Sequence, residues 1–237
     1  MPFQFDLHCH SWFSGDGVSS PESLIAAAKA KGLHGIALTD HNTCDAYHYL
    51  VDCALARRDG MPVDDFLIVP GVEVSTEEGH LLCIGAVIPQ MKGEPAREVA
   101  KAIRAAGGVA IPAHPFDVFR AGIREDILDT LELDALEVFN AAISFPKYNV
   151  RALEYAKRRS LPMIAASDAH HESSIGTSRM VFNTADFSVK GIVAAIKAGG
   201  ERQEHLLSFK DKLRKTLNNW FRLRRKRIHQ QKSGTHS

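Results

Sequence analysis

The chain has 237 residues, of which 45% are hydrophobic and 24% are charged, and these shares are ordinary for a folded globular protein. They exclude wholesale disorder and collagen-like repeats, and the lack of any run of about 18 apolar residues predicts no membrane span. The first ten residues, MPFQFDLHCH, lack a basic segment followed by an apolar one, so we expect no signal peptide. The four cysteines lack C-x-x-C spacing, which favours reduced thiols in a cytoplasmic protein over a disulfide framework.

The net charge of +1 is unevenly distributed along the sequence. Residues 1–209 carry a net charge of −8, whereas residues 210–237 contain ten basic residues and one acid. The composition changes near residues 199–200. We therefore predict a globular domain over residues 1–200 and a basic extension over residues 201–237.

Short aliphatic runs alternate with helical patterns along the first 200 residues. Ser20 and Pro21, for example, are typical of a helix start, and Gly32 is typical of a helix end. The predicted strands cover residues 3–8, 34–40, 66–75, 80–88, 108–115, 135–140, 161–170 and 179–183, and the predicted helices cover residues 20–32, 43–58, 95–106, 124–132, 146–159 and 188–198. Nearly continuous apolar strands between helices predict a parallel α/β barrel of irregular shape, with a doubly wound open sheet as the alternative.

Chemically active residues follow the predicted strands at the point where each apolar run stops. In a parallel barrel the carboxyl ends of the strands gather on one rim, so these residues would converge there. They are His8 and His10, Asp40 and His41, Glu73, His114, Glu137 and Asn140, and Asp168 and His170. Each one taken singly has an ordinary explanation as a capping or solvated side chain. Their shared position predicts a single pocket.

The types and spacing of these residues favour metal binding. Side chains two residues apart in an extended segment point the same way, so His8 and His10 can bind one ion, as can Asp168 and His170. Imidazole suits Zn and Fe, and carboxylates suit harder ions such as Mn. This mixture favours a hydrolytic site with several ions over a closed structural zinc site, which would use cysteine. Cys9 alternates with the two histidines and is expected to point into the core.

Eight short motifs occur in chain order: His8-x-His10, Ser14-Gly-Asp16-Gly, Thr39-Asp40-His41-Asn42, Pro70-Gly-Val-Glu73, His80, Pro112-Ala-His114-Pro, Glu137-Val-Phe-Asn140 and Ser167-Asp168-Ala-His170. In this combination they resemble the PHP (polymerase and histidinol phosphatase) family, over about residues 3–200. The second motif is one residue longer than the S-D-G of many small family members.

The resemblance implies a distorted (β/α)7 TIM-like barrel with two or three divalent ions, Mn, Zn or Fe, on its carboxyl face. It implies that His8, His10, Glu73 and Asp168 hold a first ion, that Glu73 bridges to a second ion held by His80 and His114, and that Asp16, His41 and His170 hold a third. Asp40 would orient a ligand imidazole. Glu137 and Asn140 would lie at the rim, or support the ligands, or be structural.

The resemblance further implies a metal-dependent phosphoesterase that acts on a small phosphorylated metabolite or a nucleotide. A metal-activated hydroxide would attack phosphorus, with Asp40, His170 and Arg179 as the candidate catalytic residues. Arg179 is expected to bind a substrate phosphate, with a solvated arginine as the alternative. Arg120, in the loop after His114, is a second candidate of the same kind.

Three other functions remain open at this point. The first is a 5′–3′ exonuclease or phosphodiesterase on RNA or DNA ends, the second an amidohydrolase-like hydrolase of C–N bonds, and the third a non-catalytic metal-binding or regulatory module. The sequence contains neither G-x-S-x-G nor G-x-x-x-x-G-K-[ST], which argues against serine-hydrolase and P-loop chemistry.

The basic extension has a helical pattern of its own. Its apolar residues recur every three or four positions and predict an amphipathic helix within residues 203–230, namely Leu206, Phe209, Leu213, Leu217 and Trp220. This helix could pack on the barrel, bind nucleic-acid phosphates, or bind an anionic membrane surface or acidic partner. Residues 231–237 are expected to be disordered.

Overall fold

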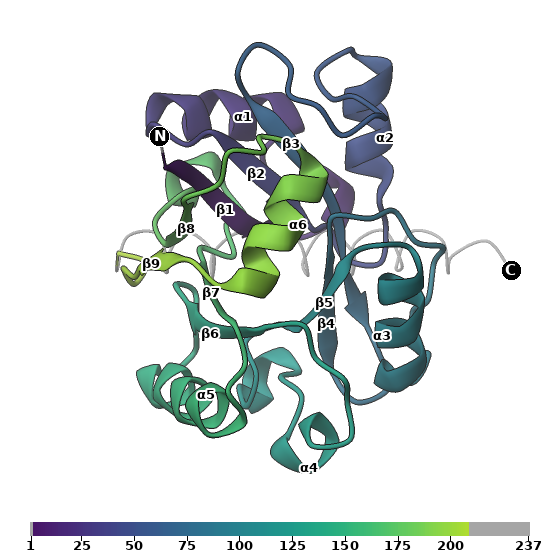
Figure 1. Cartoon of the computed structure of the whole chain (residues 1–237), viewed down its shortest axis with the longest axis vertical. Helices are drawn as coiled ribbons and strands as arrows, with labels where there is room; N and C mark the ends of the chain where they lie inside the picture. Colours follow the sequence, from purple (N-terminus) through teal and green to yellow (C-terminus); the bar gives the residue numbers. More distant parts are fainter. Residues whose placement is uncertain (1, 209–237) are drawn as a thin grey trace, which may run out of the picture.

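Strands and helices alternate along residues 2–208, the part of the chain that this computed structural model describes (Figure 1). The strands are β1 (Phe3–Cys9), β2 (Gly35–Leu38), β3 (Leu67–Ser75), β4 (His80–Ile84), β5 (Val109–Pro112), β6 (Leu136–Asn140), β7 (Met163–Ala166), β8 (Arg179–Phe182) and β9 (Glu201–Gln203). The α-helices are α1 (Pro21–Ala30), α2 (Asp45–Asp52), α3 (Ala96–Ala105), α4 (Glu125–Leu128), α5 (Pro146–Arg159) and α6 (Val189–Ala198). Short 3-10 helices are η1 (Trp12–Ser14), η2 (Val118–Arg120) and η3 (Glu172–Ser174).

Seven of these strands form one curled sheet in the order β5-β4-β3-β2-β1-β8-β9, and β6 pairs with β7 in a second sheet. The pairs β1/β2, β2/β3 and β6/β7 are parallel, whereas β3/β4, β4/β5, β1/β8 and β8/β9 are antiparallel. The prediction of an α/β fold with a TIM-like curved sheet is confirmed. The exact count of seven β/α units is not, because β4 follows β3 through a short turn and runs antiparallel to both of its neighbours.

The two-stranded sheet fills the gap between the ends of the curled sheet. β6 contacts β5, and β7 contacts both β1 and β8. A single parallel bridge joins Cys9, at the end of β1, to Ala169, just after β7. The ends of β1 and β7 therefore lie side by side, although more than 150 residues separate them in the sequence.

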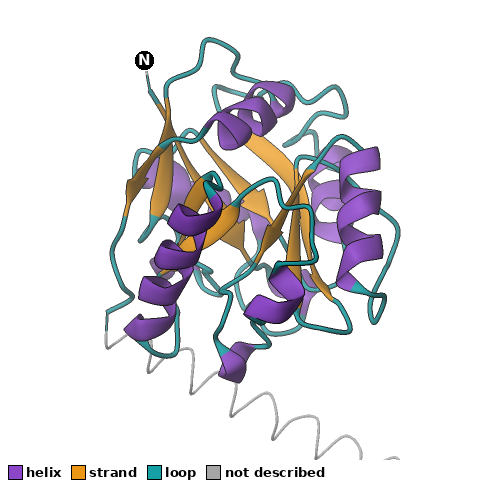
Figure 2. Ribbon diagram, turned by 60° about the horizontal axis from the view of Figure 1, so that its bottom comes forward, coloured by secondary structure: helices purple, strands orange, loops and turns teal. Residues whose placement is uncertain are grey.

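Helices cover the outside of the strands (Figure 2). α3 shows why they pack there: Ala96, Val99, Ala100 and Ile103 recur every three or four residues and are almost completely buried, and α3 contacts β4 and β5. α1 lies against β2 and α5 against β6. α6 differs, because it contacts β3, β5 and β8, and its Ile192 and Ile196 belong to the apolar cluster inside the curled sheet, with Phe5 and Leu7. The strands are buried along most of their length, as expected for a sheet covered on both faces.

Three predicted elements differ from the structure. The helix predicted over 43–58 ends at Asp52, and Ala54 beyond it has a φ of 58°, which no helix continues through. The helix predicted over 124–132 is the single turn Glu125–Leu128. Residues 201–203, assigned to the basic extension, form β9.

The remainder of the predicted basic helix, from residue 209 onward, lies outside the described residues. Within the described part, Leu206 is partly exposed, and Leu207 is buried and donates its backbone N–H to the Ala141 carbonyl. No helix in residues 2–208 has the length and apolar character needed to span a membrane.

Candidate metal centre

The end of β1 delivers two imidazoles to one side of the sheet. His8 and His10 are fully buried, and their Nε2 atoms lie 3.0 Å apart. The two-residue spacing places both rings on the same face, as expected for an extended strand. Their Nε2 atoms also lie 3.9 Å and 3.5 Å from Oδ1 of Asp168, which follows β7. β1 and β7 thus bring a His-His-Asp group together.

Glu73 of β3 is the centre of the cluster. Its carboxylate is fully buried and is surrounded by imidazoles from four other segments. Its Oε1 lies 2.8 Å from Nδ1 of His80 and 3.0 Å from Nε2 of His114. Its Oε2 lies 3.1 Å from Nε2 of His10, 3.2 Å from Nδ1 of His41 and 3.4 Å from Nε2 of His8. One carboxylate therefore contacts five rings.

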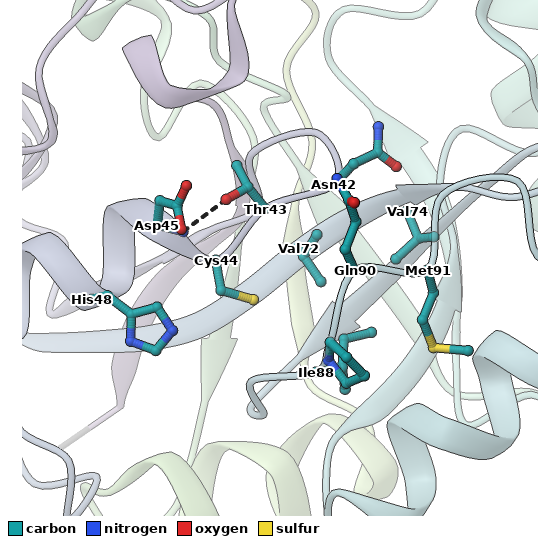
Figure 3. Close-up of a pocket in the computed structure, with 11 residues that line it drawn as sticks. Asn42, Thr43, Cys44, Asp45, His48, Val72, Val74, Ile88, Gln90 and Met91 are labelled. Atoms are coloured by element: carbon teal, nitrogen blue, oxygen red, sulfur yellow. Dashed lines mark hydrogen bonds between the residues drawn. The ribbon is translucent and has the colours of Figure 1, made fainter.

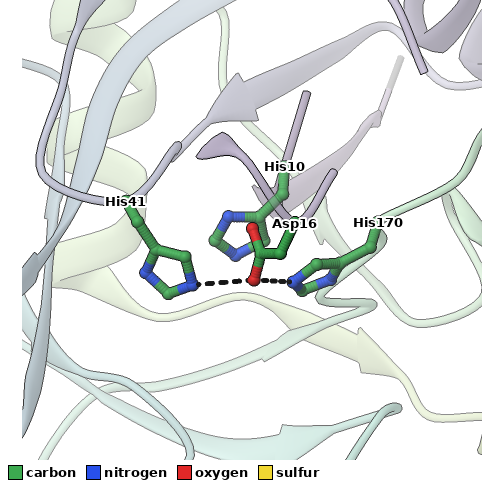
Figure 4. A group of neighbouring side chains, drawn as sticks. All are labelled: His10, Asp16, His41 and His170. Carbon is green, nitrogen blue, oxygen red and sulfur yellow. Dashed lines mark hydrogen bonds and ion pairs between the residues drawn. The ribbon is translucent and has the colours of Figure 1, made fainter. Parts of the chain in front are cut away.

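A third group forms around Asp16, in the segment after η1 (Figure 4). Its Oδ2 lies 3.3 Å from Nε2 of His41 and 3.1 Å from Nε2 of His170. The ring of His10 lies between these groups, with its centroid 4.3 Å from that of His170. The longer loop after the first motif thus still brings Asp16 to the cluster.

Burial and neighbouring charges set the protonation of the cluster. Burial acts to raise the pKa of Glu73, but the surrounding imidazoles, foremost His41 and His8, hold it well below its usual range. Burial also acts to lower the pKa of His8, but nearby carboxylates, foremost Asp168, raise it well above its usual value. Burial together with the neighbouring His170 lowers the pKa of His10 to about 3. His10 is therefore neutral at neutral pH, the form that binds a cation.

The donor atoms fit divalent cations. Within the described residues, three groups have ligand atoms within 4.8 Å of one another: His8 with His10 and Asp168, His41 with Glu73 and His80, and His10 with Asp16, His41 and His170. Asp16 Oδ1 is buried yet accepts no hydrogen bond, as a donor atom reserved for a cation would. Neutral imidazole beside carboxylate is a donor set for Zn, Fe or Mn.

These three groups correspond closely to the three predicted ligand sets. His114, predicted for the second ion, is 3.0 Å from Glu73 but does not belong to any of the three compact groups. His41, predicted for the third ion, is shared between two groups. All nine predicted ligands lie in one cluster, and their individual metal assignments remain predictions.

Supporting residues hold the ligands in place. Glu137 of β6 has Oε1 3.0 Å from Nδ1 of His8, and its Oε2 accepts hydrogen bonds from the backbone N–H of His114 and from Nδ2 of Asn140. The same Nδ2 of Asn140 donates to Oδ2 of Asp168 at 3.0 Å. Glu137 and Asn140 therefore support the ligands, one of the alternatives left open by the sequence.

The backbone is strained at several of these positions. His114, Asp168 and Asn42, which follows His41, have φ angles of 32°, 53° and 60°, a region that favours glycine. Such conformations cost on the order of 1–3 kcal/mol each and collect at functional sites, where the surrounding structure enforces them. The strain supports a functional role for this rim.

Two of the predicted catalytic residues have other contacts. Asp40 is buried, and its Oδ1 and Oδ2 accept hydrogen bonds of 2.7 Å from the backbone N–H and the hydroxyl of Ser11. Asp40 therefore fixes the chain after His10 and not a ligand imidazole, which corrects the role expected for it. Arg179 donates from Nε to Gln203 on β9. His170, the third, lies in the cluster.

Arg120, the second candidate for binding a substrate phosphate, lies at the edge of the cluster. Its guanidinium forms an ion pair with Asp168 and donates to Oδ1 of Asn140 at 3.2 Å. Sequence reasoning also missed Asp6, whose carboxylate accepts hydrogen bonds from Ser167 and from the backbone of Gly176. Asp6 is two residues before His8, but the pairing of β1 with β2 is irregular between Asp6 and Cys9, so alternation along the strand does not place its side chain.

A cavity of about 360 Å³ lies beside the cluster but is separate from it (Figure 3). Its walls include Asn42, Cys44, His48, Val72 and Val74. Because side chains alternate along a strand, Val72 and Val74 face away from the side of β3 that carries Glu73. The cavity therefore opens on the outer face of β3, and the metal-ligating groups do not line it.

Several known proteins are similar to this chain in sequence. An uncharacterised protein of Methanocaldococcus jannaschii is 34% identical over 148 residues, which cover 57% of this chain and 81% of that protein. A 5′–3′ exoribonuclease of Haemophilus influenzae is 38% identical over 76 residues, which cover 32% of this chain and 25% of that enzyme. The family described as PHP-associated matches residues 146–200. The chain belongs to the PHP-domain family.

Solved structures share the fold of this PHP-domain protein. A two-domain protein of Bacteroides vulgatus, described as containing a predicted PHP-like metal-dependent phosphoesterase, has a TM-score of 0.70 at 19% identity, and the match covers 91% of this chain and 69% of that one. A lesion-specific endonuclease of Pyrococcus furiosus has a TM-score of 0.66 at 21% identity, with coverage of 86% and 57%. The predicted PHP resemblance is confirmed, and the likeness to these structures shows the fold.

Proposed function

We propose that this PHP-domain protein is a metal-dependent phosphoesterase that hydrolyses a phosphate ester of a small metabolite or a nucleotide. The observation that carries the proposal is the contact of Glu73 with five imidazoles, flanked by Asp16 and Asp168. A buried carboxylate with this many ring nitrogens around it is suited to be a ligand shared between two cations.

Two or three divalent ions, Mn, Zn or Fe, would be held by the three ligand groups of the cluster. Bound there, they would supply a water of lowered pKa and polarise the phosphoryl oxygens. Glu137 fixes the ring of His8 through its Nδ1 atom, which leaves Nε2 directed at the cluster. Asn140 holds the carboxylate of Asp168 through a hydrogen bond. Asp40 holds the chain after His10 by accepting a hydrogen bond from the Ser11 backbone.

Arg120 is the residue best placed to bind the substrate. Its guanidinium already contacts a carboxylate at the edge of the cluster, and a guanidinium binds phosphate oxygens with the same two-pronged geometry. Burial acts to lower the pKa of Arg120, but the charges of Asp168 and Glu73 raise it, so the side chain stays cationic. We assign it to the phosphoryl group of the substrate in preference to Arg179.

A nuclease acting on RNA or DNA is the second candidate. The partial match to a 5′–3′ exoribonuclease and the fold shared with a lesion-specific endonuclease favour it. The same ligand groups would serve a phosphodiester, because two-ion sites stabilise both the attacking and the leaving oxygen.

The proposal is tested with metal-free protein that is then loaded with Mn, Zn or Fe. We expect hydrolysis of p-nitrophenyl phosphate, bis-p-nitrophenyl phosphate, nucleoside bisphosphates or 5′-phosphorylated RNA to appear only with metal. His8→Ala and Asp168→Ala should lower kcat at least about 100-fold, because each removes a ligand. Met61→Ala, an exposed change outside the cluster, is the matched control. Full activity of either ligand variant, with an unchanged circular dichroism spectrum, would refute the proposal.

A further inference from the structure

Two exposed aromatic side chains lie beside the polar cluster and have no part in the proposed function. Phe119 of η2 is 69% exposed, and Phe145, directly before α5, is 50% exposed. Their ring centroids are 5.7 Å apart, with the planes tilted by 57°. With the neighbouring Val118, also exposed, they form an apolar patch that we call the rim patch. Contiguous exposed apolar groups of this kind mark interaction sites.

The rim patch is fixed relative to the cluster by one buried acid. The carboxylate of Asp117 accepts a hydrogen bond of 3.1 Å from the backbone N–H of Phe119 and one of 2.9 Å from that of Ser144. It therefore ties together the two loops that carry the rings. Phe119 is followed directly by Arg120, whose guanidinium contacts Asp168. A phosphate beside Arg120 would place the adjoining part of its molecule at the rim patch.

Cations accompany these rings. Nζ of Lys147 lies 5.6 Å from the ring centroid of Phe145 and 5.2 Å from that of Tyr148. A shallow cavity of about 520 Å³ continues from Lys147 and Tyr148 along α5, which lies against β6 (Figure 1). Arg151 lines this cavity, is ion-paired to Glu125 and lies over the ring of Phe116, whereas Lys147 lies over that of Phe145. Aromatic faces next to cations are the composition that binds bases and phosphates of single strands.

We propose that the rim patch stacks an unpaired base of a single-stranded nucleic acid whose phosphate lies in the polar cluster. This inference rests on the proposed function, because it takes the cluster to be the phosphate site. Every base has a π-face, so stacking on Phe119 and Phe145 is independent of sequence. Among the phosphate esters that the cluster accepts, the patch would thus favour those that carry a base, without distinguishing one base from another.

The test compares two oligonucleotides that differ only in their bases. One is a fluorescent hexathymidylate with a 5′-phosphate, and the other is an abasic hexamer with the same phosphates, both with phosphorothioate linkages that resist hydrolysis. Fluorescence anisotropy with the full-length, metal-loaded protein gives each Kd. Both probes carry the same charge, so the charges of residues 210–237 contribute equally to both Kd values. The alanine variants below separate the rim patch from the aromatic residues of that segment.

We expect the wild-type protein to bind the thymidylate about tenfold more tightly than the abasic probe. Phe119→Ala and Phe145→Ala should each reduce this ratio severalfold, whereas Phe145→Tyr, which retains the ring, should keep it. Met61→Ala is the control for an exposed apolar side chain elsewhere. Equal binding of the two probes by the wild-type protein would overturn the inference, as would an unchanged ratio in both alanine variants.

Two further outcomes separate this inference from the proposed function. A base preference without hydrolysis of any phosphate ester would support the rim patch and contradict the phosphoesterase. Hydrolysis without a base preference would support the phosphoesterase and contradict the rim patch. Sedimentation that shows a dimer in the wild-type protein and a monomer in Phe119→Ala would assign the patch to a contact between two copies of the chain, and would also overturn the inference.

Discussion

Glu73 shows how a fully buried carboxylate can remain ionised. Burial of a charge costs several kcal/mol unless other groups compensate for it. Here five ring nitrogens lie within 3.4 Å of its two oxygens, and their combined effect holds its pKa well below the usual value. The compensation requires cationic neighbours, whether protonated imidazoles or metal ions. The site is therefore built around a charge that cannot be left without partners.

The hydrogen bonds between Asp40 and Ser11 allow a prediction about stability. Both hydrogen bonds of 2.7 Å join this one buried pair, so Ser11→Ala and Asp40→Asn should each destabilise the fold by about 1–3 kcal/mol. Both changes disrupt the hydrogen bond from the Ser11 hydroxyl to the Asp40 carboxylate, so their effects should be non-additive. The bond from the Ser11 backbone N–H to Oδ1 of Asp40 remains possible in Ser11→Ala. Urea unfolding of the two single variants and the double variant measures this. Additive free energies within about 0.5 kcal/mol would contradict the assigned pairing.

The residues of the cluster were predictable from the sequence, and Glu137 and Asn140 were among the candidates to support them, but the contacts of Arg120 and Arg179 were not predictable. His8, Glu73 and Asp168 end apolar strands, and strand ends converge whatever the details of the packing. The choice between Arg120 and Arg179 depends on side-chain direction after a turn. The sequence does not show that Gln203 engages Arg179, because residues 201–203 have no strand pattern.

Among the predicted elements, the strands agree best with the structure, and the lengths of the helices agree least. Apolar runs such as residues 67–75 have hydrophobic signals along their whole length. The helix predicted over 43–58 contains good helix-forming residues to its end, yet it stops at Asp52. Ala54 adopts a left-handed conformation, and the N–H groups of Ala54 and Leu55 donate to the carbonyls of Val51 and Leu50. A local capping turn therefore ends the helix, in place of the glycine that the sequence would need to signal it.

The β3 strand allows an element-scale prediction at Gly71. A Cβ atom there would lie 2.7 Å from the backbone oxygen of Cys83 and 3.0 Å from a methyl of Thr39. Neither neighbour is the end of a flexible side chain, so Gly71→Ala should separate β3 from β4 and cost about 1–3 kcal/mol. Thermal and urea unfolding would measure the loss. A variant as stable as the wild type would show that the strands can shift at no cost.

The whole molecule combines a parallel core with antiparallel additions. The α/β alternation predicted the parallel β1-β2-β3 set and the curled sheet. It did not predict that β8 runs antiparallel to β1, because strand direction depends on how a connection crosses the fold. The antiparallel β3/β4 pair was easier to anticipate, since only four residues, 76–79, join the two strands.

Metal binding should stabilise the whole fold. An ion at 100 times its Kd adds about 2.7 kcal/mol, which corresponds to a rise in Tm of about 5–11 °C for a domain of this size. We expect this rise with Mn, Zn or Fe by differential scanning fluorimetry, and its reversal with a chelator. Glu73→Gln should lose most of the shift, and Met61→Ala should keep it. A metal-independent Tm in the wild-type protein would count against the cluster as a metal site.

The two sheets contribute ligands separately. His8, His10, Glu73 and His80 lie on or just beyond strands of the curled sheet, whereas Asp168 and His170 follow β7 of the smaller sheet. Apart from the bridge from Cys9 to Ala169, no backbone ladder joins the two sheets within the described residues. Cations coordinated by residues of both sheets would hold the two sheets together. The same binding event would then complete both the reaction centre and the barrel.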